Sequence, residues 1–453
     1  MTMNVLALRT IKRWGQAVAI SLPVLAAQTL LPTVMAPISG ITLSTVQAEE
    51  NKDAKPAQKT KRTQALNNKV YEKLQAAQEA IEAKNYAEAV GILDEMKNNT
   101  RKPLNDYELS NVLNLYAFVY YSQENYPKAL NAYKQIVELA DAPEGTKVAA
   151  LYSLSQLYFV TEDFQRAVDS LLEWFKVAPE ASKGSNQYVL LGQGYYQLKD
   201  FDKALFNVNK AVDMYKSKGK VPKENWYGLQ RFLYYEKNNY KKVVEILDEL
   251  LVHYPKKQYW MQLSAMQSEL KSDSKQLAAM ETAYVQGMLE KEKELVNMAY
   301  LFLANDVPYK AAKVLDSGIR SKKIEPTSKN LELLGNAWRQ SQEIKKAIPE
   351  MAKAAAKSDK GELWARLGNI YLDNDDYSNA AKAVKSGLKK GGVKRPDTAN
   401  LVLGMAYYNM KKYDSARKAF LNAKKDKRSE KYADQWIKFM SKELERQKSL
   451  EEV

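Results

Sequence analysis

The stretch WARLGNIYLDNDDYSNAAKAVKSG, residues 364–387, decides the fold class of this chain. Its first half places Trp364, Leu367 and Tyr371 three and four residues apart, which is the spacing of one face of an α-helix. A short polar segment follows, and a second run with helical spacing begins at Tyr377. The stretch therefore predicts two amphipathic helices joined by a tight turn.

The same pattern recurs along the chain, with clear copies beginning at Leu154, Leu191 and Leu403. An anchor residue, usually Ala, occupies one fixed position in the second helix of each copy, and successive anchors lie 33 to 40 residues apart. The ten anchors are Ala89, Ala129, Ala167, Ala204, Val243, Gln276, Ala311, Ala347, Ala380 and Ala416. We expect Gly192 to face Ala204, because only small side chains allow two helices to approach closely. Such a hairpin cannot bury its apolar face alone and must stack on its neighbours.

The order Trp-x-x-Leu-Gly-x-x-Tyr, followed by the Ala anchor, resembles the tetratricopeptide repeat (TPR) family, and the resemblance extends over residues 70–450. It implies an all-α fold: a right-handed superhelical solenoid of about ten helical hairpins, closed by a C-terminal capping helix. The predicted organisation is a signal peptide (1–48), a flexible charged tether (49–66), N-terminal TPR units (67–256), degenerate TPR units with a bend (257–325), C-terminal TPR units (326–428), and a capping helix with a tail (429–453).

The N-terminal segment has the features of an export signal. Basic residues at Arg9, Lys12 and Arg13 precede an uncharged run that ends in Val46-Gln47-Ala48. This pattern predicts cleavage before Glu49 and a periplasmic protein. The alternative is an uncleaved anchor in the inner membrane, since the run is long enough to cross a bilayer. No later segment of the sequence is apolar enough to do so.

The composition argues against an enzyme. The chain has no cysteine and one histidine, His253, so neither a thiolate site nor a multi-histidine metal site can be built. We therefore predict no catalytic, cofactor-binding or metal-binding residues. The net charge is +15, from 69 Lys and Arg against 54 Asp and Glu. Because most lysines alternate with acidic residues, we read them as solvated helix faces and expect no nucleic-acid partner.

One local basic cluster stands apart, and it is open to two interpretations. It consists of Lys385, Lys389, Lys390, Lys394 and Arg395. It is either a solvated end of a repeat or an anion site, and one-sided charge of this kind mainly steers association.

The resemblance also implies a binding groove lined by the first helix of each repeat. Mapped onto the N-terminal units, the groove positions are Asn111, Asn114, Phe118, Tyr121, Tyr152, Gln156, Phe159, Val189, Gln193 and Tyr196. Amides and aromatic rings at these positions suit an extended peptide. The alternative is that the aromatic residues fill the space between adjacent repeats.

These features together predict a periplasmic protein–protein interaction scaffold. The layout is similar to that of the TPR accessory proteins of TonB–ExbB–ExbD energy-transduction systems, which implies TonB, ExbB or ExbD as partners and a role in the uptake of iron complexes. One alternative is a TPR scaffold in envelope assembly or polysaccharide export. Another is a TPR-appended enzyme, which would need a further domain that residues 70–450 do not leave room for.

Overall fold

The computed structural model describes residues 66–451, with side chains described as far as residue 447. The predicted signal peptide and residues 49–65 of the predicted tether lie outside the described residues. The described part of the chain contains 21 α-helices, one short 3-10 helix and no β-strand. It divides into two compact units, residues 66–254 and 255–451. The prediction of an all-α hairpin repeat is thus confirmed.

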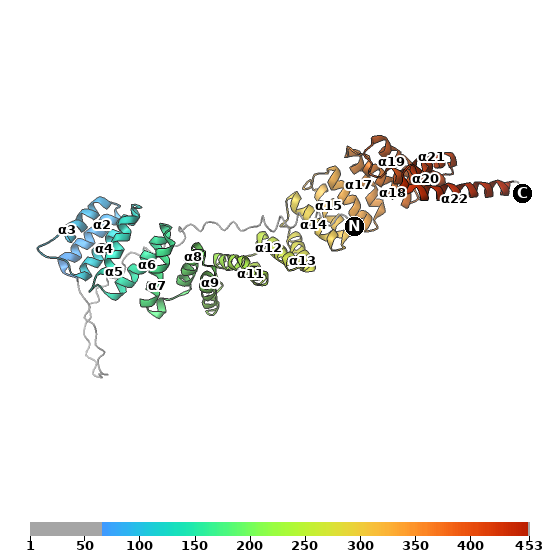
Figure 1. Ribbon diagram of the computed structural model, residues 1–453. Helices are drawn as coiled ribbons and strands as arrows, with labels where there is room; N and C mark the ends of the chain where they lie inside the picture. Colours follow the sequence, from blue (N-terminus) through green and yellow to red (C-terminus); the bar gives the residue numbers. More distant parts are fainter. Residues whose placement is uncertain (1–65, 452–453) are drawn as a thin grey trace. The chain divides into compact units, whose positions relative to one another are not determined.

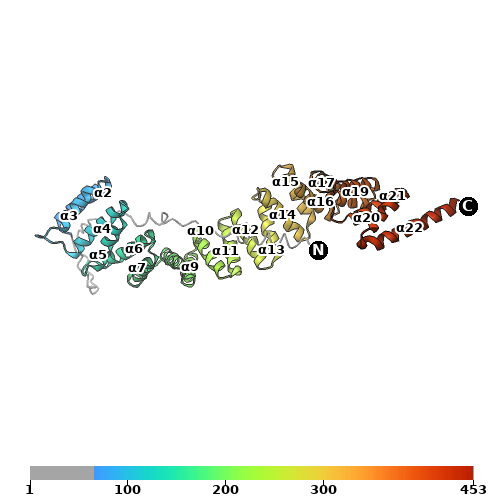
Figure 2. The same cartoon turned by 45° about the horizontal axis from the view of Figure 1, so that its top comes forward.

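Within each unit, consecutive antiparallel hairpins lie side by side (Figures 1 and 2). The N-terminal unit holds α2 (Asn68–Glu82), α3 (Tyr86–Lys97), α4 (Asp106–Ser122), α5 (Tyr126–Glu138), α6 (Glu144–Val160), α7 (Phe164–Val177), the 3-10 helix η3 (Glu180–Ser182), α8 (Ser185–Gln197), α9 (Phe201–Lys216), α10 (Glu224–Glu236) and α11 (Tyr240–His253).

The C-terminal unit continues the series. It holds α12 (Lys257–Glu269), α13 (Asp273–Val285), α14 (Glu292–Ala304), α15 (Pro308–Arg320), α16 (Ser328–Gln340), α17 (Ile344–Lys357), α18 (Glu362–Asp373), α19 (Tyr377–Lys390), α20 (Pro396–Asn409), α21 (Tyr413–Lys424) and α22 (Lys427–Glu451). Ten hairpins, from α2–α3 to α20–α21, therefore precede the long final helix.

Every one of these ten hairpins turns through one residue in the left-handed conformation, and none of these residues is glycine. They are Lys84, Glu124, Glu162, Lys199, Asn238, Lys271, Asp306, Gln342, Asp375 and Lys411, with φ between 55° and 63°. Each lies five residues before the anchor predicted for its unit. The turns therefore reproduce the predicted register of all ten repeats, including the weak ones.

The hairpin between α6 and α7 shows how the turn is held. The backbone N–H of Asp163 donates to the carbonyl of Tyr158 at 2.9 Å, across the left-handed Glu162. This is the bond that closes a helix in a Schellman motif. The Asp163 carboxylate then accepts from the backbone N–H of Arg166 at 3.2 Å, which caps α7. One residue thus ends the first helix and starts the second.

Small residues occupy the point of closest helix approach, as the spacing predicts. A Cβ atom added to Gly192 would lie 3.1 Å from the Ala204 carbonyl oxygen and 2.6 Å from Cγ2 of Val208. Gly368 has the same relation to the Ala380 carbonyl oxygen, at 3.1 Å. At this distance even one methyl group does not fit without a shift of the neighbouring helix.

Three units carry a residue other than glycine or alanine at this position. In the α6–α7 hairpin it is Ser155, whose buried hydroxyl has no hydrogen-bond partner among the described residues. In the α12–α13 hairpin the small position is Ser264, whose hydroxyl donates to the carbonyl of Gln276 at 3.1 Å, so the substitution is satisfied by a hydrogen bond. In the α10–α11 hairpin the position is Arg231, which is buried, and the anchor opposite is Val243. This hairpin is the last one before the division between the two units.

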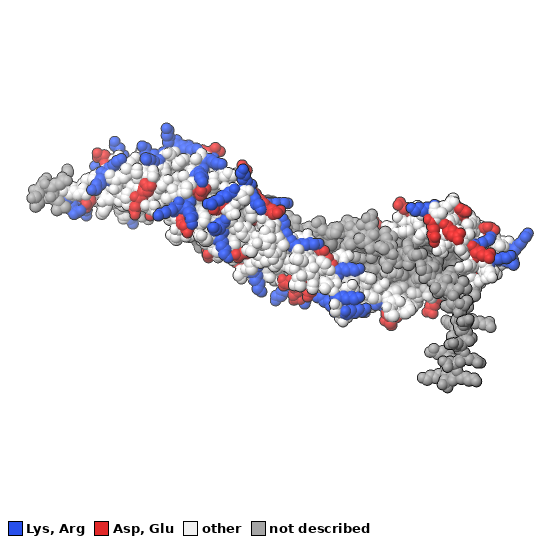
Figure 3. Space-filling view, turned by 180° about the vertical axis from the view of Figure 1, so that it is seen from behind, with Lys and Arg blue, Asp and Glu red and all other residues white. Residues whose placement is uncertain are grey.

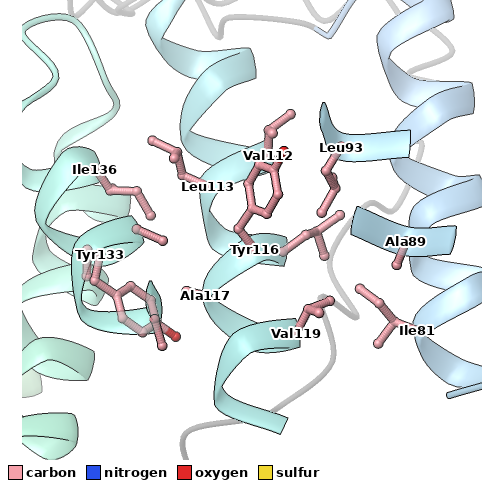
Figure 4. Close-up of a cluster of buried hydrophobic side chains, with 14 of the residues drawn as sticks. Ile81, Ala89, Leu93, Val112, Leu113, Tyr116, Ala117, Val119, Tyr133 and Ile136 are labelled. Carbon is pink, nitrogen blue, oxygen red and sulfur yellow. The ribbon is translucent and has the colours of Figure 1, made fainter. Parts of the chain in front are cut away.

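The core of the N-terminal unit is a continuous row of side chains contributed by successive hairpins. Figure 4 shows Ile81, Ala89 and Leu93 of the first hairpin against Val112 and Tyr116 of α4. On the other side of α4, Leu113 and Ala117 face Tyr133 and Ile136 of α5. Each first helix is therefore buried on two sides, which leaves one narrow stripe for other contacts.

Helix α22 closes the C-terminal unit as a cap. Trp436 stacks on Phe420 of α21 with ring centroids 5.5 Å apart, and Met440 is buried beside it. The helix begins at Lys427, two residues before the predicted start, where the backbone N–H of Arg428 donates to the Asp426 carboxylate at 3.0 Å. An apolar end of this kind must be covered in a stacked repeat array.

Candidate functional site

The first helices of the N-terminal unit carry a stripe of residues without Asp, Glu, Lys, Arg or His. It comprises the residues that lie 18, 15, 11 and 8 positions before each anchor, and we call it the amide–aromatic stripe. In α4, α6, α8 and α10 these are Asn111, Asn114, Phe118, Tyr121, Ala149, Tyr152, Gln156, Phe159, Asn186, Val189, Gln193, Tyr196, Asn225, Gly228, Phe232 and Tyr235. Steps of three and four residues place the four positions of each helix on one face.

All the groove residues predicted from the sequence belong to this stripe, and most are half-buried. Asn111, Asn114, Phe118 and Tyr121 of α4 are of intermediate exposure, whereas Gln156 of α6 is buried. Their assignment as a binding site stays a prediction, because burial alone does not distinguish a ligand contact from packing.

Several side-chain amides of the stripe lack hydrogen-bond partners. Nδ2 of Asn111 donates to the Tyr107 carbonyl of its own helix at 2.8 Å. Asn114 and Gln193 make no hydrogen bond within the described part of the chain, and Oε1 of Gln156 is buried there without a partner. A buried amide oxygen without a donor is costly, by roughly 1–3 kcal/mol. The half-buried side-chain amides of Asn114 and Gln193 are available to an extended peptide backbone, whereas Oε1 of Gln156 is enclosed.

The aromatic rings of the stripe, in contrast, make regular contacts with the next helix of their own hairpin. The centroids of Tyr121 and Tyr126 are 5.9 Å apart, and Phe159 and Phe164 are separated by 6.1 Å. The same pairing recurs at Tyr196 and Phe201, 6.2 Å; at Tyr235 and Tyr240, 5.9 Å; and at Tyr408 and Tyr413, 5.9 Å. These rings therefore have a packing role whether or not they also touch a ligand.

Some rings of the stripe also reach into the following hairpin. Tyr196 meets Phe232 of α10 edge to face, with centroids 5.4 Å apart. The Tyr152 hydroxyl accepts a hydrogen bond of 3.4 Å from Nε2 of Gln187 in α8, while the Tyr152 ring lies 5.3 Å from Trp174 of α7, in its own hairpin. Burial raises the pKa of Tyr152 above its ordinary value. Its hydroxyl thus stays protonated at neutral pH.

A hollow lies between α2 and α4, the first helices of the first two hairpins, and it extends the predicted site. It is lined by Leu66, Tyr71, Leu74, Gln75, Gln78, Asn111 and Leu115. Tyr71, Leu74 and Gln78 occupy the stripe positions of α2. Sequence reasoning missed them and the α10 residues of the stripe, although the anchor spacing that located Asn111 would have found them when applied to the units on either side.

The equivalent positions of the C-terminal unit have a different chemistry. They include Lys293, Lys329, Glu332, Arg339 and Glu362. Arg366 bridges two of these residues, with Nη1 2.7 Å from Glu332 and Nε 3.2 Å from Glu362. The amide–aromatic character is thus a property of the N-terminal unit and not of the repeat in general.

The remaining candidates for a reactive or metal-binding site are His253 and the carboxylate side chains. His253 is the last residue of α11, with Nε2 3.9 Å from a carboxylate oxygen of Glu249. Over residues 66–447 no group of three or more histidine and carboxylate side chains is arranged to hold a metal ion. None of the described helices combines the length and apolar character needed to cross a membrane.

The predicted basic cluster is partly engaged within the fold. Arg395 forms a two-pronged ion pair with Asp397, with the shortest contact at 2.6 Å. Lys385, Lys389 and Lys390 are exposed on α19.

Comparison with known proteins shows which repeat family two segments of the chain match. Residues 119–184 and 365–430 match a family model described as Tetratricopeptide repeat. A 65-residue segment is 37% identical to Anaphase-promoting complex subunit 3 of Dictyostelium discoideum; it makes up 14% of this chain and spans only 6% of that relative. A tetratricopeptide repeat protein of Parabacteroides merdae is similar at 15% identity and a TM-score of 0.33, over 55% of this chain and 94% of that one. The TPR2AB domain of yeast Sti1, solved as a complex with pHSP90, is similar at 14% identity and a TM-score of 0.33, over 59% and 99% of the two chains.

Proposed function

We propose that this chain, two segments of which match the tetratricopeptide repeat family model, is a non-catalytic scaffold for protein–protein interaction whose N-terminal unit binds an extended peptide segment of its partner. The observation that carries the proposal is the amide–aromatic stripe. It runs along the first helices without a single charged residue, in a protein in which 27% of residues are charged.

Two properties of the stripe favour a peptide over other ligands. Its unpaired amides, such as Asn114 and Gln193, can both donate to and accept from a peptide backbone. Its half-exposed rings, such as Phe118 and Tyr121, supply contact area at low conformational cost because they are already fixed by their neighbours. An uncharged stripe also favours a partner segment that is itself free of charge clusters.

The test separates binding from packing. Asn114→Ala and Gln193→Ala should each weaken partner binding by about 1 kcal/mol with little change in melting temperature, because their side-chain amides make no hydrogen bond to residues 66–447. Tyr152→Ala removes a ring packed on Trp174, so it should lower stability by about 3 kcal/mol and binding as well. Phe206→Ala, on the exposed side of α9 with 66% of the residue accessible, is the control and should change neither. Binding that survives both amide substitutions would refute the stripe as the site.

We also propose a compartment and a partner for this protein, and both proposals rest on the sequence. The basic, apolar and small-residue succession of residues 1–48 supports export to the periplasm. Mass spectrometry of the mature protein should then find Glu49 at the N-terminus. An intact Met1 in the membrane fraction would instead support the uncleaved anchor.

A role beside TonB, ExbB and ExbD is proposed from the resemblance in length, signal and repeat layout. Recovery of these proteins with the chain from cross-linked cell envelopes would support it. Recovery of only outer-membrane assembly or polysaccharide-export components would favour the alternative scaffold role and would leave the stripe as the binding surface.

A further inference from the structure

The charge of this chain is distributed very unevenly. Residues 66–254 contain 23 Lys and Arg against 25 Asp and Glu, so the N-terminal unit is close to neutral. The 70 residues from Tyr377 to Arg446, which form α19–α22, contain 18 Lys and Arg against 7 Asp and Glu. Among the charged side chains toward the C-terminus on the face in Figure 3, blue ones accordingly outnumber red ones. The excess is a property of the last two hairpins and the cap.

Four lysines of the cap form a row on one side of α22, a side that also carries Glu445 and Asp434, the latter paired with Lys424 at 2.7 Å. Lys427, Lys431, Lys438 and Lys442 are all exposed, and their spacing of four, seven and four residues places them within an arc of about 60° on α22. The row is about 22 Å long at 1.5 Å per residue. Within residues 66–447 none of the four is in an ion pair, whereas the arginines nearby are: Arg428 with Asp426, and Arg446 with Glu443.

Two exposed aromatic residues flank this row on the same helix. Tyr432 is 60% and Phe439 51% exposed, and both lie about 60–80° further round the helix from Lys442. The opposite side of α22, with Trp436 and Met440, is buried on α20 and α21. Phe439 also packs on Tyr408 of α20, with ring centroids 5.6 Å apart, so it lies at the border of the buried side. The exposed side of the cap thus combines lysines with Tyr432 and the uncovered part of the Phe439 ring.

We propose that this lysine row, together with Tyr432 and Phe439, docks the C-terminal end of the protein on the surface of a membrane rich in anionic phospholipids. Unpaired lysines on flexible stems suit a plane of phosphates with no fixed geometry. Rings beside such a row enter the boundary between headgroups and acyl chains. Base-specific recognition of a nucleic acid would call for arginine forks, and the arginines of α22 are occupied by carboxylates; binding to phosphates alone is the outcome that the experiment below tests against.

The experiment measures co-sedimentation of the full chain with vesicles of equimolar phosphatidylcholine and phosphatidylglycerol, against vesicles of phosphatidylcholine alone. Each lysine near an anionic surface multiplies partitioning roughly fivefold. The variant with all four row lysines changed to Gln should therefore lose binding to the anionic vesicles by at least about tenfold. The matched control changes Lys69, Lys102, Lys218 and Lys241 to Gln; these are exposed lysines of the N-terminal unit outside ion pairs with described residues. It makes the same change in net charge and should bind like the wild type.

A second readout locates the contact. Because the chain has no cysteine, Tyr432→Cys can carry a single environment-sensitive fluorophore, with Phe206→Cys on α9 as the reporter control. Anionic vesicles should shift the emission of the label at 432 to shorter wavelength and leave the label at 206 unchanged. Equal loss of binding in both four-lysine variants, an equal shift at both labels, or tighter binding to single-stranded nucleic acid than to the vesicles would overturn the proposal.

Discussion

Asp397, in the first turn of α20, accepts a hydrogen bond of 2.7 Å from the hydroxyl of Ser429 in the first turn of α22, and both residues are buried. This contact joins the last hairpin to the cap. The Asp397 carboxylate also receives the Arg395 guanidinium, with its Oδ1 and Oδ2 both engaged. The cap is thus held by a polar clasp at its start and by the stacked rings of Phe420 and Trp436 further along.

Asp397→Asn should loosen this clasp. The amide keeps the shape of the carboxylate but loses the charge that Arg395 binds, so we expect a loss of about 1–3 kcal/mol in the unfolding free energy of the C-terminal unit. Hydrogen exchange resolved along the chain should show that, relative to the wild type, Asp397→Asn accelerates exchange in α22 more than in α16. Ser415→Ala, in the neighbouring α21, is the control substitution. Unchanged protection of α22 would mean that its apolar contacts alone fix the cap.

The same clasp should make the cap sensitive to acid. The ion pair with Arg395 holds the pKa of Asp397 well below its ordinary range. A carboxylate whose pKa is depressed by folding stabilises the native state above its unfolded pKa of about 3.9, and this contribution is lost as the pH falls further. Urea unfolding of the wild type and of Asp397→Asn should therefore differ at pH 7 and converge toward pH 2. A difference that stays constant across this range would exclude the carboxylate as its source.

Gly192→Leu should separate α8 from α9. The new side chain would meet Val208 and the Ala204 carbonyl, and overpacking of this kind typically costs about 1–3 kcal/mol. Gly91→Leu is the matched control, because a Cβ at Gly91 in α3 has no neighbour within 4 Å. The control should melt at or slightly above the wild-type temperature, since glycine disfavours helix by roughly 0.5–1 kcal/mol. Equal melting of the two variants would contradict the assigned repeat register.

Substitutions of Glu162 test whether the hairpin turn adopts the left-handed conformation. At φ 59° a β-branched residue is strained, so Glu162→Val should cost about 1–3 kcal/mol. Glu162→Gly removes the strain but has more freedom to lose on folding, so its stability should lie within about 1 kcal/mol of the wild type. The urea unfolding midpoints of the wild type, Glu162→Val and Glu162→Gly measure these differences in stability. A valine variant as stable as the glycine variant would show that the turn adopts another conformation in solution.

The candidate site could be predicted in part. The sequence located Asn111 and its equivalents because the three- and four-residue steps of α4 recur at a fixed distance before each anchor. It left open whether Tyr152 faces a ligand or a neighbouring repeat. The structure shows the ring against Trp174 of its own hairpin and its hydroxyl bonded to Gln187 of the next one, and these contacts depend on how different helices pack, which no spacing within one helix encodes.

The sequence by itself determined the hairpin, its ten-fold repetition and the close approach at Gly192, because these depend on helical periodicity and side-chain size within some twenty consecutive residues. Only the tertiary structure decided the rest: the buried Arg231 at a position otherwise held by small residues, the contact of Tyr196 with Phe232, and the clasp of Asp397 and Ser429. Each of these joins different helices or hairpins. The repeat spacing varies from 33 to 40 residues because the loops differ in length. Which side chains of neighbouring helices meet therefore depends on how the helices pack in three dimensions.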